Sequence, residues 1–258
     1  MSMREKVALV TGGGGDGIGR AIAVGLAREG IAVVVADINE EGGRETMRQV
    51  EENGGRAAFV LADVTAEGDV REMVTFAEGR FGGLDVLVNN AGGVESPCFP
   101  NAEPAHWGRA LDLNLRGVML GIQFGLQAMR KRGGGTIVNI ASMAGIGYRP
   151  YTAPEYAASK AGVVRLTAAL GRLKEDLNVR VNCICPGWVA TPAVKRYLAE
   201  TPKAELEKLE YPPPPVLIQP EQIADAVITF IRDDSLAGRV MLWPDGEPWR
   251  LVPVDASI

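Results

Sequence analysis

Two side chains that can move a proton stand four residues apart in this chain. Tyr156 and Lys160 belong to an apolar-periodic segment that predicts a helix. At this spacing they lie one turn apart on one helix face, so the ammonium can sit beside the phenol. A free tyrosine titrates near a pKa of ~10, and a close cation favours the phenolate. The pair predicts a proton donor and acceptor for carbonyl and alcohol chemistry, although the same spacing also occurs on ordinary solvated helix faces.

A glycine-rich turn offers a place for a phosphorylated ligand. Residues 11–19 read Thr-Gly-Gly-Gly-Gly-Asp-Gly-Ile-Gly, between an apolar strand and a helix. Glycines let the backbone turn tightly and approach a pyrophosphate, and the first amides of the helix favour its charge. In this strand, turn and helix context the motif predicts dinucleotide binding. The residues assigned to the cofactor here are Gly13, Asp16, Gly17, Ile18 and Gly19.

A carboxylate at the end of the second predicted strand indicates which dinucleotide binds. Asp37 can accept hydrogen bonds from ribose hydroxyls, and it would repel a 2'-phosphate. Asp16 adds a second negative charge near the same place, and it is equally suited to be a helix N-cap. Ile38 follows Asp37, so no basic side chain is available there for a phosphorylated ribose. We expect NAD rather than NADP.

Strands and helices alternate along the chain. Predicted strands cover residues 6–10, 31–36, 57–61, 84–88, 136–141, 179–184 and 238–242, and the first predicted helices cover 18–28 and 40–52. The strands are short and mostly apolar, as in parallel sheets that are buried on both faces. This pattern predicts an α/β fold of the Rossmann type, a doubly wound parallel sheet forming a single domain over residues 1–258. Ligands should then bind beyond the carboxyl ends of the strands.

Composition excludes several classes of protein. The 258 residues are 47% hydrophobic, which suffices for one buried core. The 27 basic and 32 acidic residues form no long runs, which argues against partners such as nucleic acid or anionic membranes. The N-terminus enters an apolar strand without a cationic region or a long hydrophobic segment, and no later run approaches a membrane span. We therefore expect a cytoplasmic protein.

The three cysteines and the single histidine do not form a metal-binding pattern. Cys183 and Cys185 flank one residue of an apolar strand, so their side chains share a sheet face and are expected to be buried thiols. Cys98 leaves the count odd, and His106 has no Cys or His neighbour in sequence. No metal site is predicted.

Further motifs follow the other strands in a fixed order. They are Asp63-Val64, Asn89-Asn90-Ala91-Gly92, Asn114 in a predicted long helix, Ser142, and Pro186-Gly187. Together with the glycine turn and the Tyr156/Lys160 pair, they make the chain resemble the short-chain dehydrogenase/reductase (SDR) family, in its compact one-domain branch. The resemblance runs over nearly the whole length.

The resemblance implies a set of cofactor contacts. By this similarity Asp63 and Val64 hold the adenine, and Asn90 and Gly92, with Ala91 between them, line the cofactor cleft. Val189 and Thr191, which follow Pro186 and Gly187, contact the carboxamide end, and Lys160 holds the nicotinamide ribose. It also implies that Asn114 anchors a water that relays protons, and that the protein forms a homodimer or homotetramer.

The residue types suit alcohol and ketone chemistry. Ser142 can hydrogen-bond a substrate carbonyl, and Tyr156 can deliver or remove the proton while a hydride passes to or from a nicotinamide. Alone, Ser142 would be an ordinary strand-end residue and Asn114 a polar group inside a helix. As a set, Asn114, Ser142, Tyr156 and Lys160 predict the catalytic residues.

Three features depart from the family pattern. Four residues separate Gly12 from Gly17 where the family has three, and Ser142 precedes Tyr156 by fourteen residues instead of thirteen. The segment 148–154 can absorb that extra residue. In it Tyr148 and Tyr151 are expected to line the substrate pocket with Ser142 and Tyr156, or else to pack in the loop. Near the C-terminus, Trp243 and Trp249 take the place of a closing glycine pair, and they suit either a subunit contact or the edge of the active site.

Substrate choice should lie with a lid at about residues 190–219, the segment from Thr191 to Gln219. Tyr211–Pro215 is expected to be a stiff, extended connection within it. We expect an NAD-dependent oxidoreductase whose partner is a small alcohol or carbonyl compound, a secondary alcohol or ketone of moderate size. One alternative is a 3-oxoacyl thioester reductase that uses NADPH, with Arg130–Arg132 either attracting a carrier protein or only ending a helix. The other is a non-catalytic nucleotide sensor.

Overall fold

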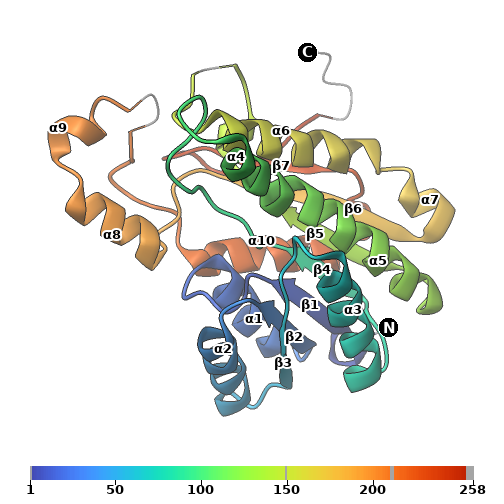
Figure 1. The fold of residues 1–258 in the computed structure, drawn as a ribbon. Helices are drawn as coiled ribbons and strands as arrows, with labels where there is room; N and C mark the ends of the chain where they lie inside the picture. Colours follow the sequence, from blue (N-terminus) through green and yellow to red (C-terminus); the bar gives the residue numbers. More distant parts are fainter. Residues whose placement is uncertain (1, 149, 210–211, 254–258) are drawn as a thin grey trace.

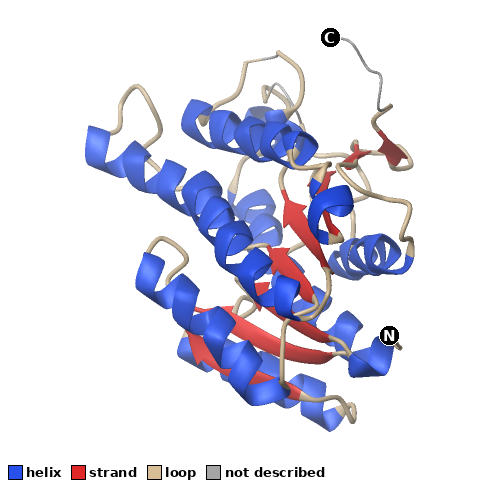
Figure 2. Cartoon of the chain, turned by 90° about the vertical axis from the view of Figure 1, so that its right-hand side faces the viewer, coloured by secondary structure: helices blue, strands red, loops and turns tan. Residues whose placement is uncertain are grey.

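A single eight-stranded sheet lies between two layers of helices (Figures 1 and 2). The structure is a computed structural model that describes residues 2–148, 150–209 and 212–253. The strand order is β3-β2-β1-β4-β5-β6-β7-β8, and every neighbouring pair is parallel except β7 and β8. The predicted single-domain α/β fold of the Rossmann type is confirmed.

The seven predicted strands are present. They are β1 (Val7–Thr11), β2 (Ala32–Asp37), β3 (Ala57–Leu61), β4 (Val86–Asn89), β5 (Gly135–Ile140), β6 (Val179–Pro186) and β7 (Val240–Trp243). Their ends differ from the predicted ones by at most two residues. The two-residue strand β8 (Arg250–Leu251) was not predicted, because it is defined by its antiparallel pairing with β7 and by no local pattern of its own.

Proline begins four of the helices, where its fixed φ and missing N–H cost nothing. These are α4 (Pro104–Leu111), α6 (Pro154–Ala169), α8 (Pro192–Glu200) and α10 (Pro220–Arg232). The other α-helices are α1 (Ile18–Arg28), α2 (Glu40–Glu52), α3 (Glu67–Phe81), α5 (Gly117–Lys131), α7 (Leu173–Leu177) and α9 (Lys203–Leu206). Short turns are η1 (Met3–Glu5), η2 (Asp112–Arg116) and η3 (Met143–Gly145).

Alternate strand residues feed two separate cores. On β1, Val7 and Leu9 pack toward α3 and α5, whereas Ala8 and Val10 pack toward α1, α2 and α10. Both faces of the sheet are therefore covered, and all five residues of β1 are buried. This explains why the strands read as continuous apolar runs rather than as alternating ones.

A chain of buried amides and hydroxyls ties α6 to the centre of the sheet. Asn89 Nδ2 on β4 donates to Asn139 Oδ1 on β5 at 2.9 Å, and Asn139 Nδ2 donates to Thr167 Oγ1 on α6 at 3.0 Å. Thr167 in turn donates to the carbonyl of Val163 at 2.9 Å. All three polar side chains are buried, so each hydrogen bond is one that water cannot replace. The chain fixes the position of the helix that carries Tyr156 and Lys160.

The predicted proline-rich connection lies between α9 and α10. Tyr211 is outside the described residues, and the prolines from Pro212 to Pro215 lie in a loop without regular secondary structure. Within the part of the chain that the structure describes, no helix is both long and apolar enough to cross a membrane.

Replacing Thr167 by valine should destabilise the protein by about 1–3 kcal/mol, because Asn139 then loses a buried hydrogen-bond partner. Thr75→Val on α3 is the matched control. Thr75 makes the same bond to the carbonyl four residues earlier, but it is exposed, so its replacement should change stability by no more than about 0.5 kcal/mol. Urea unfolding of both variants measures the difference, and equal losses would show that the buried network contributes nothing.

Candidate functional site

The predicted site residues gather at one edge of the sheet. Parallel strands end together at this edge, so short segments that are far apart in sequence become neighbours. The glycine turn follows β1, Asp37 ends β2, Asp63 follows β3, Asn90 follows β4, Ser142 follows β5 and Gly187 follows β6.

The phenol of Tyr156 lies against Ser142 and Tyr151. Burial around its hydroxyl raises the pKa of Tyr156 to about 12, although a hydrogen bond with Ser142 works in the opposite direction. The ring of Tyr151 stacks on that of Tyr156, with 6.3 Å between centroids and 27° between planes. Ser142 precedes Tyr156 by fourteen positions, and the intervening turn and η3 bring them together.

Lys160 is buried behind this phenol. Its Nζ donates to the carbonyl of Ile140 at 3.0 Å and lies 5.6 Å from the centroid of the Tyr156 ring. Burial lowers the pKa of Lys160 to about 8. The expected lowering of the Tyr156 pKa by the ammonium is therefore wrong for this structure. Desolvation disfavours the charged form of both groups, and for the phenol it outweighs the hydrogen bond with Ser142.

The thiols of Cys183 and Cys185 lie on β6 beside Lys160. Both side chains are fully buried and their Sγ atoms are 3.8 Å apart, which confirms the predicted pair of buried thiols on one sheet face. Their negative charge, when present, would raise the pKa of Lys160. Among the residues that the structure describes, no three His, Cys, Asp or Glu side chains are grouped so as to hold a metal ion.

Asn114 is buried in η2, a single π-helical turn between α4 and α5. The sequence predicted a long helix here, and the structure interrupts it with one π-helical turn, in which hydrogen bonds span five residues instead of four. Asn114 Nδ2 donates to the carbonyls of Gly93 and Ala110, both at 2.9 Å, and its Oδ1 accepts from the Gly93 amide at 3.0 Å. A methyl group on Gly92 would lie 2.6 Å from Asn114 Oδ1 and 3.1 Å from Lys160 Nζ. Asn114 and Lys160 thus converge on Gly92.

The glycine turn is packed so closely that side chains would not fit. Gly12 has a φ of +66°, and its amide donates to the carbonyl of Ala36 at 2.9 Å. A methyl group on Gly19 would lie 2.2 Å from the carbonyl oxygen of Gly12, and Asn90 Nδ2 donates to that same oxygen at 3.1 Å. The first turn of α1 is therefore drawn onto the loop, with Gly17 preceding Ile18 at its start. This tight cradle fits a pyrophosphate that binds to backbone amides.

Asp37 holds the extra residue of the glycine turn. Its Oδ2 accepts from the Gly14 amide at 2.7 Å and its Oδ1 from the Asn39 amide at 2.8 Å. A methyl group on Gly14 would lie 2.7 Å from Asp37 Cγ, so the two residues are in direct contact. The position after Gly12 is fixed as well, because Thr46 Oγ1 on α2 donates to the carbonyl of Gly13 at 2.7 Å.

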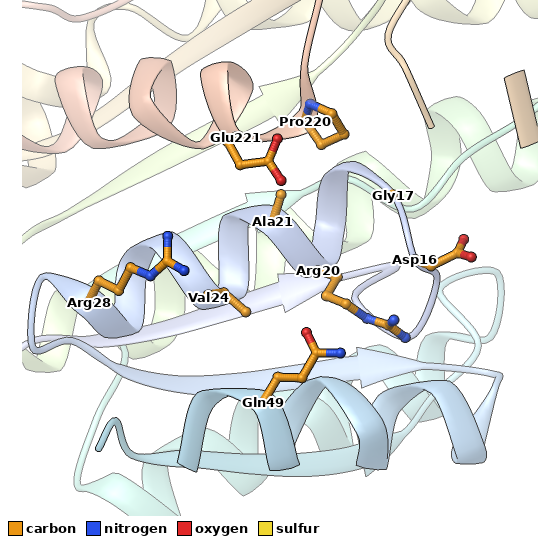
Figure 3. Close-up of a pocket in the computed structure, with 9 residues that line it drawn as sticks. All are labelled: Asp16, Gly17, Arg20, Ala21, Val24, Arg28, Gln49, Pro220 and Glu221. Atoms are coloured by element: carbon orange, nitrogen blue, oxygen red, sulfur yellow. The ribbon is translucent and has the colours of Figure 1, made fainter. Parts of the chain in front are cut away.

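Asp16 does not cap α1. The N-cap is Gly17, which has no side-chain cap, and Asp16 is exposed, so the N-cap interpretation was wrong. Asp16 instead borders a surface hollow of about 200 Å³ along the outer side of α1, between α2 and the start of α10 (Figure 3). Arg20 in that hollow donates to the carbonyls of Gly14 and Gly42, at 3.4 and 3.3 Å. It therefore supports the glycine turn from behind.

Asp63 and Val64 follow β3, and each is held by its own contacts. Asp63 Oδ1 accepts from the amide and the hydroxyl of Thr65, each at 2.8 Å. Val64 is buried, and a methyl group on Gly117 would lie 3.0 Å from its carbonyl oxygen. The loop is thus held against the start of α5.

The segment after β6 is held from the C-terminal side. Pro186 ends β6, the Gly187 amide donates to the carbonyl of Trp243 at 2.9 Å, and the Trp188 amide donates to Asp245 Oδ1 at 2.6 Å. Burial raises the pKa of Asp245. The sequence did not single out Asp245, because a lone Asp-Gly after a terminal strand reads as an ordinary turn.

This segment then returns to the glycine turn. Val189 forms a bridge with Ile218, and Thr191 is the N-cap of α8, its Oγ1 accepting from Val194 N at 3.2 Å. A methyl group on Gly17 would lie 3.1 Å from Thr191 Cγ2. The segment from Pro186 to Thr191 therefore runs in space from the end of β6 to the start of α1.

The aromatic residues of the predicted site and of the C-terminus differ in exposure. Tyr148 is 87% exposed, whereas Tyr151 is half-buried against Tyr156. Trp243 packs on the core beneath α1 and α10, and Trp249 is 43% exposed. Glu155, which the sequence did not single out, is buried beside Tyr156 and accepts from the Phe99 amide at 3.3 Å.

Comparison with known proteins agrees with this geometry. The family model described as short chain dehydrogenase matches residues 6–202. An uncharacterised oxidoreductase of Thermotoga maritima is 39% identical over 92% of this chain and 91% of its own. A cyclohexanol dehydrogenase of an Acinetobacter species is 38% identical over 90% of this chain and 89% of its own. A solved short-chain dehydrogenase/reductase of Burkholderia xenovorans superposes with a TM-score of 0.86 at 33% identity, covering 95% of this chain and 97% of that one.

The buried lysine should make stability depend on pH. The pKa of Lys160 is about 8 in the folded protein, whereas the unfolded chain has the ordinary lysine pKa of 10.5. Burial of the charged lysine therefore costs stability below the folded pKa, and this cost disappears as the pH rises toward 10.5. Between pH 7 and pH 9.5 the wild type should gain about 2 kcal/mol relative to Lys160→Met, which cannot titrate. Urea unfolding of both proteins at the two pH values gives this difference, and parallel pH profiles would contradict it.

Proposed function

Because the chain belongs to the short-chain dehydrogenase/reductase family, we propose that it transfers a hydride between NAD(H) and a secondary alcohol or ketone of moderate size. The observation that supports this most is that Tyr156 lies between Ser142, which hydrogen-bonds it, and the buried Lys160, at the sheet edge that also holds the glycine turn. A bound nicotinamide would supply the hydride donor or acceptor.

The chain's own residues would handle the proton. The Ser142 hydroxyl holds the substrate oxygen, and the neutral phenol of Tyr156 donates its proton to that oxygen when a ketone is reduced. For alcohol oxidation the proton travels the other way. Acid/base assistance of this kind is worth roughly 10²- to 10⁴-fold in rate.

Lys160 would stabilise the phenolate that remains after the proton has left. With a pKa of about 8 it is mostly protonated at neutral pH, and its charge is buried near the Tyr156 ring. A cation in a desolvated position acts more strongly on a newly formed anion than it would in water. The energy that burial costs the ground state is in this way partly recovered when Tyr156 loses its proton.

The dinucleotide would lie along the strand ends, from the glycine turn to the segment after β6. The amides at the start of α1, near Gly17, would hold the pyrophosphate, and Asp37 would accept from the ribose hydroxyls. The carboxylate of Asp37 favours NAD, because a 2'-phosphate there would face a negative charge that already holds Gly14 and Asn39. An actinorhodin polyketide ketoreductase of this fold, 33% identical with a TM-score of 0.83, was solved with NADPH, so the fold by itself does not exclude the phosphorylated dinucleotide.

An uncharged, apolar ring compound is the substrate class that we favour. Exposed apolar side chains stand on three loops: Val94 and Phe99 after β4, Tyr148 after β5 and Val216 between α9 and α10. Cyclohexanol, in the name of the Acinetobacter relative, is such a compound.

A second candidate activity is reduction of a 3-oxoacyl thioester. A 3-oxoacyl-(acyl-carrier-protein) reductase of Thermotoga maritima is 31% identical over 91% of this chain. The basic cluster suited to a carrier protein lies at the other edge of the sheet, however. Lys131 pairs with Glu78, and Arg132 pairs with Asp85 just before β4 begins. These cations end α5, with Gly133 at a φ of +81°, so the helix-end interpretation fits better.

The remaining expectations belong to this proposal as well. A non-catalytic sensor would have no use for a serine, a tyrosine and a lysine brought together from β5 and α6, and we favour the enzyme. A homodimer or homotetramer is what the family resemblance implies, and light scattering would determine the oligomeric state. The cytoplasmic location stays an expectation from the sequence.

Tyr156→Phe should lower turnover by roughly 10²- to 10⁴-fold, because the ring remains and the proton donor is lost. NADH should still bind nearly as tightly as to the wild type. Initial rates with a panel of cyclic alcohols and ketones, together with NADH fluorescence titration, measure the two effects. Wild-type turnover in this variant would show that Tyr156 is not the acid/base.

Asp37→Ala should weaken NAD binding about tenfold or more and reduce the preference over NADP, because a charged hydrogen-bond acceptor is removed. Asp37→Asn is the matched control, since it removes the charge but keeps one acceptor for the Gly14 or Asn39 amide. The KM and kcat/KM values of both variants with NAD and with NADP measure the change in binding and in preference. A preference that survives in both variants would place the NADP discrimination elsewhere.

A further inference from the structure

The segment between Ala190 and Ile218, which carries α8 and α9, leaves and rejoins the body of the molecule just beyond the end of β6. Its start and its end lie side by side, because Ala190 N donates to the carbonyl of Ile218 at 2.8 Å and Ile218 N donates to that of Trp188 at 3.0 Å. Between these points the two helices project from the body of the molecule (Figure 1). Among the described residues of α8 and α9, none is buried.

One aromatic contact joins α8 to the body. The ring of Tyr197 on α8 stacks on that of Trp188, with 6.1 Å between centroids and 14° between planes. Tyr197 is 42% exposed, so its ring is not needed to fill a core. Nearly parallel rings at this separation attract each other beyond the area that they bury.

The inner half of this stack is held rigidly. The Trp188 amide donates to Asp245 and its carbonyl accepts from Ile218, while the preceding Gly187 amide donates to Trp243. Trp188 is thus fixed to the C-terminal segment and to the far end of the segment between Ala190 and Ile218. The outer half, Tyr197, belongs to a helix with no buried residues. Such a contact can open without disturbing the sheet.

We propose that Trp188 and Tyr197 form an aromatic latch that seats α8 and so controls how tightly the dinucleotide is retained. The link to the ligand is Thr191, which caps α8 and lies against Gly17 at the start of α1. When the rings separate, α8 loses its seat and Thr191 loses its fixed position over the glycine turn. The inference rests on the proposed function, because it places the dinucleotide at that turn. Trp188 and Tyr197 act here as positioning residues that touch neither the substrate nor the reacting atoms.

The test compares Tyr197→Ala with Tyr197→Phe, which keeps the ring. A stack of this kind contributes enough that its loss should change an opening equilibrium about two- to tenfold. In Tyr197→Ala we expect trypsin to cut after Lys203 in α9 and after Lys208, just beyond it, faster by that factor, and NADH to bind more weakly by a similar factor. Tyr197→Phe should restore both. Glu200→Ala, an exposed change on the same helix, is the matched control and should leave both at wild-type values.

The proteolysis is run on the protein without added dinucleotide, so it does not depend on catalysis. Wild-type cleavage and wild-type NADH affinity in Tyr197→Ala would overturn the latch, and so would equal defects in the Phe and Ala variants. If the wild type itself failed to bind NADH, the proposed function would fall. The rates of cleavage would still decide whether Tyr197 seats α8.

Discussion

Desolvation of one phenol and one amine is the constraint around which this structure is built. Tyr156 and Lys160 stand on one face of α6, and that face is pressed against the ends of β5 and β6, where Lys160 is left with the Ile140 carbonyl as a partner. The same burial that moves both pKa values away from the charged forms also keeps water from competing for the proton. Burying these two groups lowers the stability of the fold. In the same desolvated site, the loss of a proton from Tyr156 interacts more strongly with the nearby ammonium than it would in water.

The buried polar chain from β4 through β5 to α6 holds that face in place. Asn139 accepts from Asn89 and donates to Thr167, and Asn114 holds Gly93 in the loop after β4. These bonds fix the distance between the helix that carries the acid/base pair and the strands that end at the dinucleotide site, and a displacement of an ångström there would separate Ser142 from Tyr156.

The glycine turn and the segment after β6 contact each other at the start of α1. Asp37 binds the turn through Gly14, so the carboxylate that we assign to cofactor choice also fixes the shape of the loop. The segment after β6 reaches the same turn through Thr191, and it is held from behind by Asp245. Asp37 and Thr191 thereby contact the same backbone loop, at Gly14 and at Gly17.

The sequence by itself determined the strand and helix alternation, the glycine turn, the fold class and the buried cysteine pair, because each is written in local periodicity or in residue types that permit few conformations. It also placed Ser142, Tyr156 and Lys160 at neighbouring strand ends and on one helix face. The direction of the two pKa shifts was decided only by the tertiary structure, because desolvation depends on every atom packed around a group and not on its neighbour four residues away. For the same reason the π-helical turn at Asn114, the strand β8 and the contact of Asp245 with Trp188 could not be read from the chain. Each of them exists through partners distant in sequence, and only the folded packing determines those partners.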